Sequence, residues 1–461
     1  MTYTYMATLK SMVALVSISL AAAASAGTQP RAPAQVIPGS ASGEFFGSIL
    51  NAEADLDRDG YNELIVSSST GSNQRGKVEI FRGSRAGLST TPSFSYVGPM
   101  DWAQAGASPV VADFNGDGWP DLLIGAPNWS GAQTYAGAVL FFAGSKKGFP
   151  SKPTQVIEGP STNSFFGFVI RSLGDFNGDG RADVAISALG ANSGAGNIYI
   201  YSGSASGLST TPTSTLTGKA PWLYFGRVMD AADFDGDGIV DLAVGRQSPT
   251  AGIPGMTWIY KGHATGYDNT ATDRLFAVVP DDSDYFGDTV SALGDIDGDG
   301  YPDLAVGAPY HLGAGGFPTG LITVYFGSGQ GLGGSGRTQV LYGDGVPNMF
   351  MLGGNVRGRR DMNGDGRPDL LVGPTMYGRP NDENLEWPGS VWVYYAGPTG
   401  LSANPQLLAS GAPGSRDEVG TSLEAGQVLS SKGLDLIAGS GMYNANGMSH
   451  SGILRIYRGR K

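Results

Sequence analysis

The sequence predicts an all-β protein, a seven-bladed β-propeller of four-stranded antiparallel blades. Three observations predict this fold. Glycine provides 74 of the 461 residues, roughly twice the usual share, and so much glycine suits tight turns but is costly inside helices. One pattern of about 62 residues recurs seven times along the chain. Each copy holds four short apolar segments separated by turn glycines, as a propeller blade does.

An acidic loop marks six of the seven copies. Successive loops begin 58, 62, 58, 62 and 66 residues apart. Their first residues are Asp55, Asp113, Asp175, Asp233, Asp295 and Asp361. A further 66 residues leads to Gln427, in a seventh copy that keeps the strand after the loop but has lost the acidic residues.

The elements follow in the same order in every copy. Each copy opens with Phe-Gly or its relic, at Phe46-Gly47, Ala105-Gly106, Phe166-Gly167, Phe225-Gly226, Phe286-Gly287, Leu352-Gly353 and Val419-Gly420. A short strand leads into the acidic loop, and a second apolar strand follows it, as in residues 122–127. A third strand ends in glycine, as in residues 198–203, and a weaker fourth segment follows a Gly-Leu pair, as in residues 155–159.

Closure into a ring distinguishes a propeller from other repeat folds. A β-helix rung is far shorter than this repeat, and separate domains of this size are marginal without disulfides. The last copy ends after its third strand at Gly459, whereas residues 35–39 form a lone fourth segment that closely matches residues 155–159. We expect this segment to complete the last blade and to remove an exposed sheet edge. The expected blades span about 39–97, 98–158, 159–217, 218–279, 280–342, 343–409, and 410–461 together with 31–38.

The acidic loop has the pattern of a calcium site. Positions 1, 3 and 5 are Asp or Asn, position 6 is Gly and position 9 is acidic, so oxygen ligands converge in a tight turn, as a hard cation requires. Position 7 varies in side chain, which fits a ligand supplied by its backbone carbonyl. The expected ligands are Asp55, Asp57, Asp59, Tyr61, Glu63, Asp113, Asn115, Asp117, Trp119, Asp121, Asp175, Asn177, Asp179, Arg181, Asp183, Asp233, Asp235, Asp237, Ile239, Asp241, Asp295, Asp297, Asp299, Tyr301, Asp303, Asp361, Asn363, Asp365, Arg367 and Asp369.

Two other interpretations of the loop are weaker. An EF-hand needs Glu at position 12 and a following helix, but position 12 is Val or Ile within a predicted strand in all six loops. Asx turns without metal leave three or four carboxylates repelling one another. The loops hold 21 of the 41 acidic residues, so six calcium ions bring the formal charge of the exported chain from −13 to about −1. We therefore expect about six structural Ca2+ ions.

Composition and the N-terminal residues indicate export and exclude several kinds of chemistry. Residues 1–26 contain Lys10, an apolar stretch and a small-x-small cleavage site, as in a Sec-type signal peptide. We expect a secreted or periplasmic propeller of residues 27–461, monomeric and without a membrane span. The absence of cysteine excludes disulfides and thiolate zinc sites. The acidic balance, 41 acidic against 29 basic residues, disfavours a nucleic-acid partner.

The Phe-Gly opening, the nine-residue acidic loop and a Gly-Ala-Pro after the second strand resemble the FG-GAP repeat family, which includes the N-terminal propeller of integrin α subunits. The resemblance covers nearly all of residues 27–461. It implies seven blades, calcium between the first and second strands, and adhesion or ligand recognition on the opposite face. Gly-Ala-Pro is complete only at residues 125–127 and 307–309, and nothing resembles the leg domains, membrane span or tail of an integrin.

The expected ligand face lies opposite the acidic loops. In an up-and-down blade, the loops from strand two to three and from strand four to the next blade emerge there. Aromatic residues concentrate in these loops, which suits stacking on sugars or anchoring of a protein partner. The alternative is that they plug the channel mouth or pack between blades. The candidates are Trp102, Trp129, Trp222, Tyr224, Tyr285, Tyr310, His311, Tyr377, Trp387 and Tyr443.

The leading function is a non-enzymatic recognition or adhesion module for extracellular protein or glycan ligands. The sequence contains no nucleophile elbow, zinc-protease motif or phosphate loop. The alternative is an extracellular polysaccharide lyase, hydrolase or phosphodiesterase in which His311 or His450 acts as acid or base, although lone histidines in surface loops are more often solvated. We expect a solvated segment leading into a strand, and not an anion site, at Arg357, Arg359 and Arg360.

Overall fold

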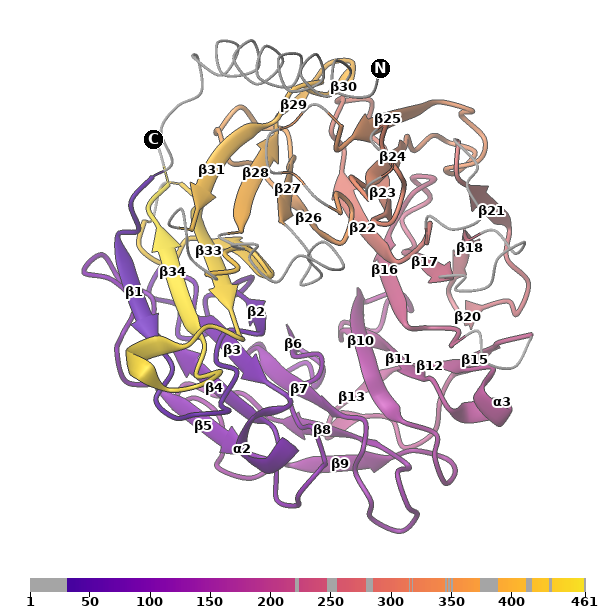
Figure 1. Cartoon of the computed structure of the whole chain (residues 1–461). Coiled ribbons are helices and arrows are strands. Elements are labelled where there is room, and N and C mark those ends of the chain that lie inside the picture. Colours follow the sequence, from indigo (N-terminus) through magenta and orange to yellow (C-terminus); the bar gives the residue numbers. More distant parts are fainter. Residues whose placement is uncertain are drawn as a thin grey trace, which may run out of the picture.

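The computed structural model describes residues 31–219, 224–246, 255–278, 285–314, 316, 318–344, 346, 349, 351–373, 389–411, 417–430 and 433–459. These residues form a closed ring of seven four-stranded antiparallel sheets (Figure 1). The predicted all-β, seven-bladed propeller is therefore confirmed. Described helical structure is limited to three short turns, α2 (Gly71–Gln74), α3 (Ala191–Gly194) and η1 (Ala445–Gly447). None of the described helices has the length and apolarity to cross a membrane.

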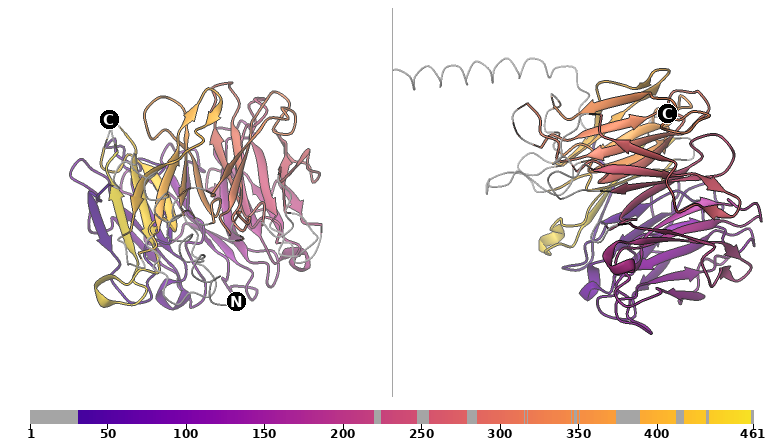
Figure 2. Two further views of the ribbon diagram at one scale, coloured as in Figure 1. Left: turned by 45° about the horizontal axis from the view of Figure 1, so that its top comes forward. Right: turned by 90° about the vertical axis from the view of Figure 1, so that its right-hand side faces the viewer.

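Each sheet orders its strands from the axis outward, and loops gather at the two ends of the ring (Figures 1 and 2). The sheets are β2 (Ile49–Asn51), β3 (Leu64–Ser68), β4 (Lys77–Phe81), β5 (Phe94–Val97); β6 (Val110–Ala112), β7 (Asp121–Ala126), β8 (Ala138–Phe142), β9 (Gln155–Glu158); β10 (Phe166–Gly174), β11 (Asp183–Ala188), β12 (Asn197–Tyr201), β15 (Ser214–Thr217); β16 (Val228–Ala232), β17 (Asp241–Arg246), β18 (Met256–Tyr260), β21 (Asp273–Phe276); β22 (Thr289–Gly294), β23 (Asp303–Ala308), β24 (Leu321–Tyr325), β25 (Thr338–Tyr342); β26 (Asn355–Arg360), β27 (Asp369–Gly373), β28 (Ser390–Tyr394), β31 (Gln406–Ser410); and β32 (Ser422–Gly426), β33 (Asp435–Ser440), β34 (Ile453–Tyr457), β1 (Gln35–Pro38).

Within the described ranges, three blades carry an additional hairpin of two-residue strands between their third and fourth strands. Glycine begins one or both strands of each hairpin. The hairpins pair β13 (Gly203–Ser204) with β14 (Gly207–Leu208), β19 (Gly262–His263) with β20 (Gly266–Tyr267), and β29 (Ala396–Gly397) with β30 (Gly400–Leu401).

The last blade takes its fourth strand from the other end of the described chain. Strand β1 pairs antiparallel with β34, with Gln35 opposite Ile456. The Gln35 side chain also forms two hydrogen bonds with the next blade. Its Nε2 donates to the Leu88 carbonyl and its Oε1 accepts from the Leu88 amide, both at 2.9 Å. Gln155 makes the same pair of bonds to Leu208. The N-terminal strand thus makes the same inter-blade contact as a fourth strand within the chain.

Apolar side chains hold the blades together. The second strands are buried at nearly every residue, which explains their continuous Val, Ile, Leu and Ala composition. In the described part of the chain, seven apolar clusters each span two neighbouring sheets. One of them joins Phe46 of the first sheet to Leu454 of the last. The core is therefore a closed series of interfaces between blades, and each blade is stabilised by packing against its neighbours.

The Phe-Gly dipeptide joins each blade to the one before it. Phe166 is fully buried and packs edge-on against Tyr201 of its own blade, with 5.9 Å between ring centroids. Gly167 has φ +86°, and a Cβ there would lie 2.5 Å from the carbonyl oxygen of Ala138 in the preceding blade. Glycine is therefore needed for both backbone conformation and close approach.

The residue before the Phe-Gly position is left-handed in all seven blades, with φ between 47° and 58°. These residues are Phe45, Gln104, Phe165, Tyr224, Tyr285, Met351 and Glu418. None is glycine, so each blade carries one locally strained residue at this turn.

Candidate metal centres and ligand face

The six acidic loops join the first and second strands of six blades. Because first strands occupy equivalent places in the ring, the loops share one face of the molecule. Position 12 of every loop lies inside a second strand, for example Val306 in β23. This placement excludes an EF-hand, which requires a helix there.

Internal hydrogen bonds give each loop its shape. In the loop of residues 295–303, the Asp295 carboxylate accepts from the amides of Asp299 (3.0 Å) and Gly300 (2.9 Å), and Asp299 accepts from the amide of Tyr301 at 3.0 Å. The bond from the position-6 glycine to the position-1 aspartate recurs in all six loops at 2.8–2.9 Å. The turn therefore holds side chains 1, 3 and 5 close together.

The position-9 carboxylate is buried beneath the loop. Asp303 is fully buried; its Oδ2 accepts from the amide of Ile296 at 3.0 Å and its Oδ1 from Gly327 at 2.9 Å. Asp121, Asp183, Asp241 and Asp369 make the same two kinds of bond. Position 9 therefore ties the acidic loop to the end of the third strand, a role that the sequence pattern did not suggest.

Burial raises the pKa of the position-9 carboxyls. Desolvation is the largest cause, and nearby loop carboxylates add to it, whereas backbone donors oppose it. The pKa of Asp303, Asp241 and Glu63 rises to about 7. The pKa of Asp121, Asp183 and Asp369 rises to about 6. These carboxylates are thus costly to ionise unless a positive charge compensates them.

Three loops bring carboxylate oxygens together as a cation site would. Ligand atoms lie within 4.8 Å of one another in the clusters Asp55, Asp57, Glu63; Asp233, Asp235, Asp241; and Asp295, Asp297, Asp299. In the first cluster, Asp57 Oδ1 and Glu63 Oε1 are buried and have no hydrogen-bond partner among the described residues. Orphaned, converging anionic oxygens fit a divalent cation, for which such atoms are the preferred ligands.

Loops with Asp at position 3 have a basic side chain beside that residue. Arg82 lies 3.6 Å from Asp57, and Lys261 pairs with Asp235. Arg337 pairs with Asp297. The other three loops have Asn at position 3, at Asn115, Asn177 and Asn363. The additional carboxylate is therefore matched by a cation that directly follows the third strand or directly precedes the fourth, and three further acidic residues remain in every loop.

Position-7 side chains contact the neighbouring loop. The Arg58 guanidinium lies 4.1 Å from the centre of the Trp119 ring, and Arg181 Nε donates to the Asn115 carbonyl at 3.4 Å. Arg367 Nη1 donates to the Ile296 carbonyl at 3.5 Å. The sequence interpretation gave position 7 a backbone role only, so these contacts between loops were missed. Whether its carbonyl binds metal remains a prediction.

The aromatic candidates on the opposite face divide into exposed and packed residues. Trp102 is 56% exposed and Tyr224 43% exposed. Tyr285 packs against Tyr310, with 4.6 Å between ring centroids. His311 lies near Tyr342 with centroids 6.3 Å apart. Trp222, Tyr377 and Trp387 lie outside the described residues.

Two of the aromatic candidates make contacts that account for them without a ligand. Trp129 Nε1 donates to Glu158 at 3.3 Å, and its ring packs against the core. The Arg455 guanidinium lies over the Tyr443 ring, 5.2 Å from its centre. Conversely, Tyr135 in the loop between β7 and β8 is 42% exposed but was not among the predicted candidates. Its position in a loop between second and third strands is the same signal that selected other candidates.

The arginines of β26 correct another expectation. Arg357, Arg359 and Arg360 were expected on a solvated strand approach, but all three line a cavity on the axis of the ring. The expectation is clearly wrong for Arg360, whose side chain is 15% exposed and pairs with Glu424 at 2.8 Å and Glu53 at 2.9 Å. The innermost strands bring these residues together from different blades, which spacing along the chain does not reveal.

Comparison with known families agrees with the fold and the loop pattern. Residues 105–142 and 286–325 match the FG-GAP repeat, and residues 175–244 match an FG-GAP-like repeat. The chain is thus a β-propeller that contains FG-GAP repeats.

Its relatives include integrin α subunits. The chain is 30% identical to human integrin alpha-6 over 190 residues, which cover 41% of this chain and 16% of the relative. It is 32% identical to human integrin alpha-7 over 224 residues, covering 48% and 19%. Rat phosphatidylinositol-glycan-specific phospholipase D is 35% identical over 168 residues, covering 34% and 20%. The matched segments therefore span a fifth or less of each of these relatives.

Proposed function

We propose that this chain is an exported, calcium-stabilised FG-GAP propeller that recognises an extracellular protein or glycan. The similarity to integrin α subunits supports a recognition or adhesion role. The signal-like residues 1–26 support export. The observation that carries the calcium part is the convergence of buried, unpartnered carboxylate oxygens at Asp57 and Glu63.

Calcium has a structural role in this proposal. About six ions would occupy the acidic loops and neutralise carboxylates that otherwise repel one another. Each ion binds the folded loop and not the unfolded chain, so at a free concentration ten times its Kd it adds about 1.4 kcal/mol to stability. The ions lie on one face, which leaves the opposite face for a ligand.

The ligand is expected to bind the exposed aromatic residues of that opposite face. Trp102, Tyr135 and Tyr224 are each more than 40% exposed, and each has positive φ in a loop. Large exposed rings supply contact area at low entropic cost and suit sugar rings or an apolar protein surface. Trp129, whose ring packs against the core, provides a contrast.

A binding screen tests this function. The purified chain is applied to glycan and extracellular-matrix protein arrays with calcium and, separately, with EDTA. A specific ligand should be retained in calcium, and binding should fall at least about tenfold in Trp102→Ala or Tyr224→Ala because interface aromatics carry much of the binding energy. An exposed serine in a loop between third and fourth strands, changed as Ser151→Ala, is the control. A ligand that binds all variants equally contradicts the assignment of this face.

The alternative is an extracellular enzyme acting on a polysaccharide or a phosphodiester. It is retained because one group of relatives is named as a phospholipase D. His450 Nδ1 lies 3.1 Å from Ser449 Oγ, and His450 stacks on Phe45 at 5.5 Å. Turnover of phosphodiester or polysaccharide substrates that is abolished in His311→Ala or His450→Ala would favour the enzyme. Retention of ligand binding by both variants, without turnover in the wild type, favours recognition.

A further inference from the structure

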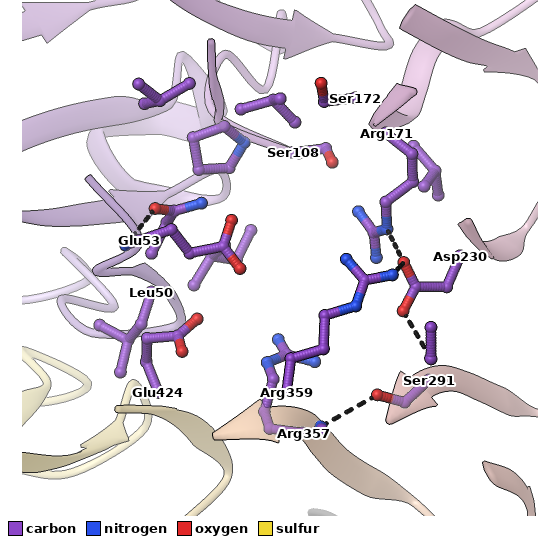
Figure 3. Close-up of a pocket in the computed structure, with 18 of the residues that line it drawn as sticks. Leu50, Glu53, Ser108, Arg171, Ser172, Asp230, Ser291, Arg357, Arg359 and Glu424 are labelled. Atoms are coloured by element: carbon purple, nitrogen blue, oxygen red, sulfur yellow. Dashed lines mark hydrogen bonds and ion pairs between the residues drawn. The ribbon is translucent and has the colours of Figure 1, made fainter. Parts of the chain in front are cut away.

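A cavity of about 390 Å³ lies on the axis of the ring (Figure 3). Residues in or next to the innermost strands of all seven blades line it, from Glu53 after β2 to Glu424 in β32. Its volume falls within the roughly 300–1,000 Å³ of typical small-molecule sites. A second cavity of about 130 Å³ adjoins it, shares Arg171 and Arg357 with it, and adds Arg227. The axis is thus an arginine-rich channel in a chain whose formal charge is −12.

Two arginines approach one aspartate in this cavity, and a third arginine lies beside them. Arg171 Nε lies 3.9 Å from Asp230 Oδ1, and Arg359 Nη2 lies 3.5 Å from the same oxygen. Figure 3 shows Arg171 and Arg359 reaching Asp230 from different strands, with Arg357 beside Arg359. Asp230 Oδ2 is already occupied, because it accepts from the Ala292 amide at 2.8 Å. Among the described residues, Asp230 is the one carboxylate within 4.0 Å of these three arginines, so their charges are only partly balanced at short range.

Arg357 has no acidic partner among the residues that the structure describes. Its Nε donates to the Leu423 carbonyl at 3.2 Å and its Nη1 to the Val356 carbonyl at 3.1 Å. No carboxylate oxygen lies within 4.0 Å of its guanidinium in the described part of the chain. A guanidinium in a cavity retains its charge, so a missing counter-ion is a cost to the folded protein.

The other side of the cavity carries one negative charge in excess, because one arginine there faces two carboxylates. Arg360 binds both Glu53 and Glu424, so these two carboxylates are engaged. Burial lowers the pKa of Arg171; the charges of Asp230 and Glu53 oppose this, whereas those of Arg357 and Arg359 add to it. Four arginines and three carboxylates line the cavity, so the lining carries one positive charge in excess, and Arg171, Arg357 and Arg359 lie on its positive side.

A hydroxyl group lies beside the same cluster. Ser291 Oγ accepts from the Gly358 amide at 3.1 Å, and its proton has no acceptor among the described residues. The seryl O–H can therefore donate into the cavity. Guanidinium forks together with a hydroxyl donor match the several acceptor oxygens of a tetrahedral oxyanion.

We propose that the axial cavity binds a tetrahedral oxyanion of the sulfate or phosphate class, held by Arg171, Arg357 and Arg359. An anion there would offset the positive charge of these three guanidinium groups. The site shares no residue with the acidic loops or with the aromatic ligand candidates, so its failure would leave the proposed function untouched.

Calorimetric titration of the calcium-loaded full chain tests the site. Sulfate is the probe, since phosphate precipitates calcium, and chloride at equal ionic strength is the reference. We expect one saturable site with a Kd of about 1 mM or lower for sulfate and none for chloride. Absence of saturable sulfate binding overturns the proposal.

Variants locate the bound anion. Arg357→Gln should weaken sulfate binding roughly tenfold, since it removes a charged donor. Arg85→Gln, on an exposed arginine remote from the cavity, should leave it unchanged. Asp230→Asn should tighten binding severalfold by removing the competing carboxylate, and this gain does not depend on whether Arg357→Gln folds. Equal affinities in all of these variants would place the anion elsewhere and overturn the proposal.

The source of the oxyanion is distinguished by a second probe. If p-nitrophenyl sulfate competes with sulfate in the wild type, the channel admits an ester, and the natural ligand is a sulfated or phosphorylated group on a larger molecule. If only the inorganic ion binds, the ligand is a free anion. Either result supports the oxyanion site, whereas competition that persists unchanged in Arg357→Gln contradicts it.

Discussion

At the scale of single residues, the position-9 carboxylate has two separable roles. The seventh blade has lost its acidic loop but keeps an aspartate at the equivalent place, Asp435. Asp435 is fully buried and accepts from the amides of Leu429 at 2.6 Å and Gly459 at 2.9 Å. The same residue type persists where no metal is expected, so its backbone bonds are themselves a reason for a carboxylate there.

Replacing these aspartates separates the two roles. Asp435→Ala should cost about 1–3 kcal/mol in the free energy of unfolding, with or without calcium, because one buried and one part-buried amide lose their acceptor. Asp303→Ala should cost a similar amount without calcium and more with it, since it also removes an expected ligand. Urea unfolding in both conditions measures this. Identical calcium dependence in the two variants would contradict the distinction.

The glycine of the Phe-Gly pair gives a second residue-scale prediction. Gly167 and Gly148 have the same φ of +86°, but a Cβ at Gly148 meets nothing within 4 Å whereas one at Gly167 meets the Ala138 carbonyl. Gly148→Ala should therefore cost about 1 kcal/mol for backbone conformation alone. Gly167→Ala should cost clearly more. Equal losses of thermal stability would show that close approach to the preceding blade is unimportant.

At the scale of elements, the sequence is most informative about the acidic loop and its following strand. The spacing of acidic residues predicted the positions of the loop, and the run of apolar residues after it predicted the buried second strand. Both features depend only on residues within about ten positions along the chain. The partners of Asp57, Asp235 and Asp297 were not predicted. Their partners Arg82, Lys261 and Arg337 lie next to strands later in the same blade, and their approach depends on how the blade folds.

The loops also predict an unusual pH dependence of stability. In the metal-free fold, burial raises the pKa of Asp303 to about 7, against about 4 in an unfolded chain. Between these values the folded state keeps a proton that the unfolded state has lost, so the contribution of this group to stability falls as pH rises from about 4 to 7. Five other loops add to the effect.

Urea unfolding at pH 5 and pH 7.5, with metal-free and calcium-saturated protein, measures this dependence. Ionisable groups outside the loops titrate in the same way in the metal-free and the calcium-saturated protein. The difference in unfolding free energy between these two samples therefore reports on the loops alone. We expect the stabilisation by calcium to be larger at pH 7.5 than at pH 5, because the ion favours the ionised carboxylates. A stabilisation that is equal at both values would be evidence against metal at position 9.

At the scale of the whole molecule, the seven apolar clusters form a cycle, and this cycle creates the axial cavity. The repeat predicted the ring, because seven similar units cannot bury their faces alone. The cavity was not predictable, since residues from β10, β16, β22 and β26 meet there only when the ring closes. The same limit applies to the ligand face, where packing, and not composition, separates exposed Trp102 from packed Trp129.

The number of calcium ions bound per chain tests the central claim most directly. The protein is stripped of metal, titrated with calcium by calorimetry, and analysed for metal after equilibrium dialysis. The account predicts about six bound ions per chain and a rise in Tm on binding. A chain that retains no calcium and has the same Tm in calcium and EDTA would contradict it.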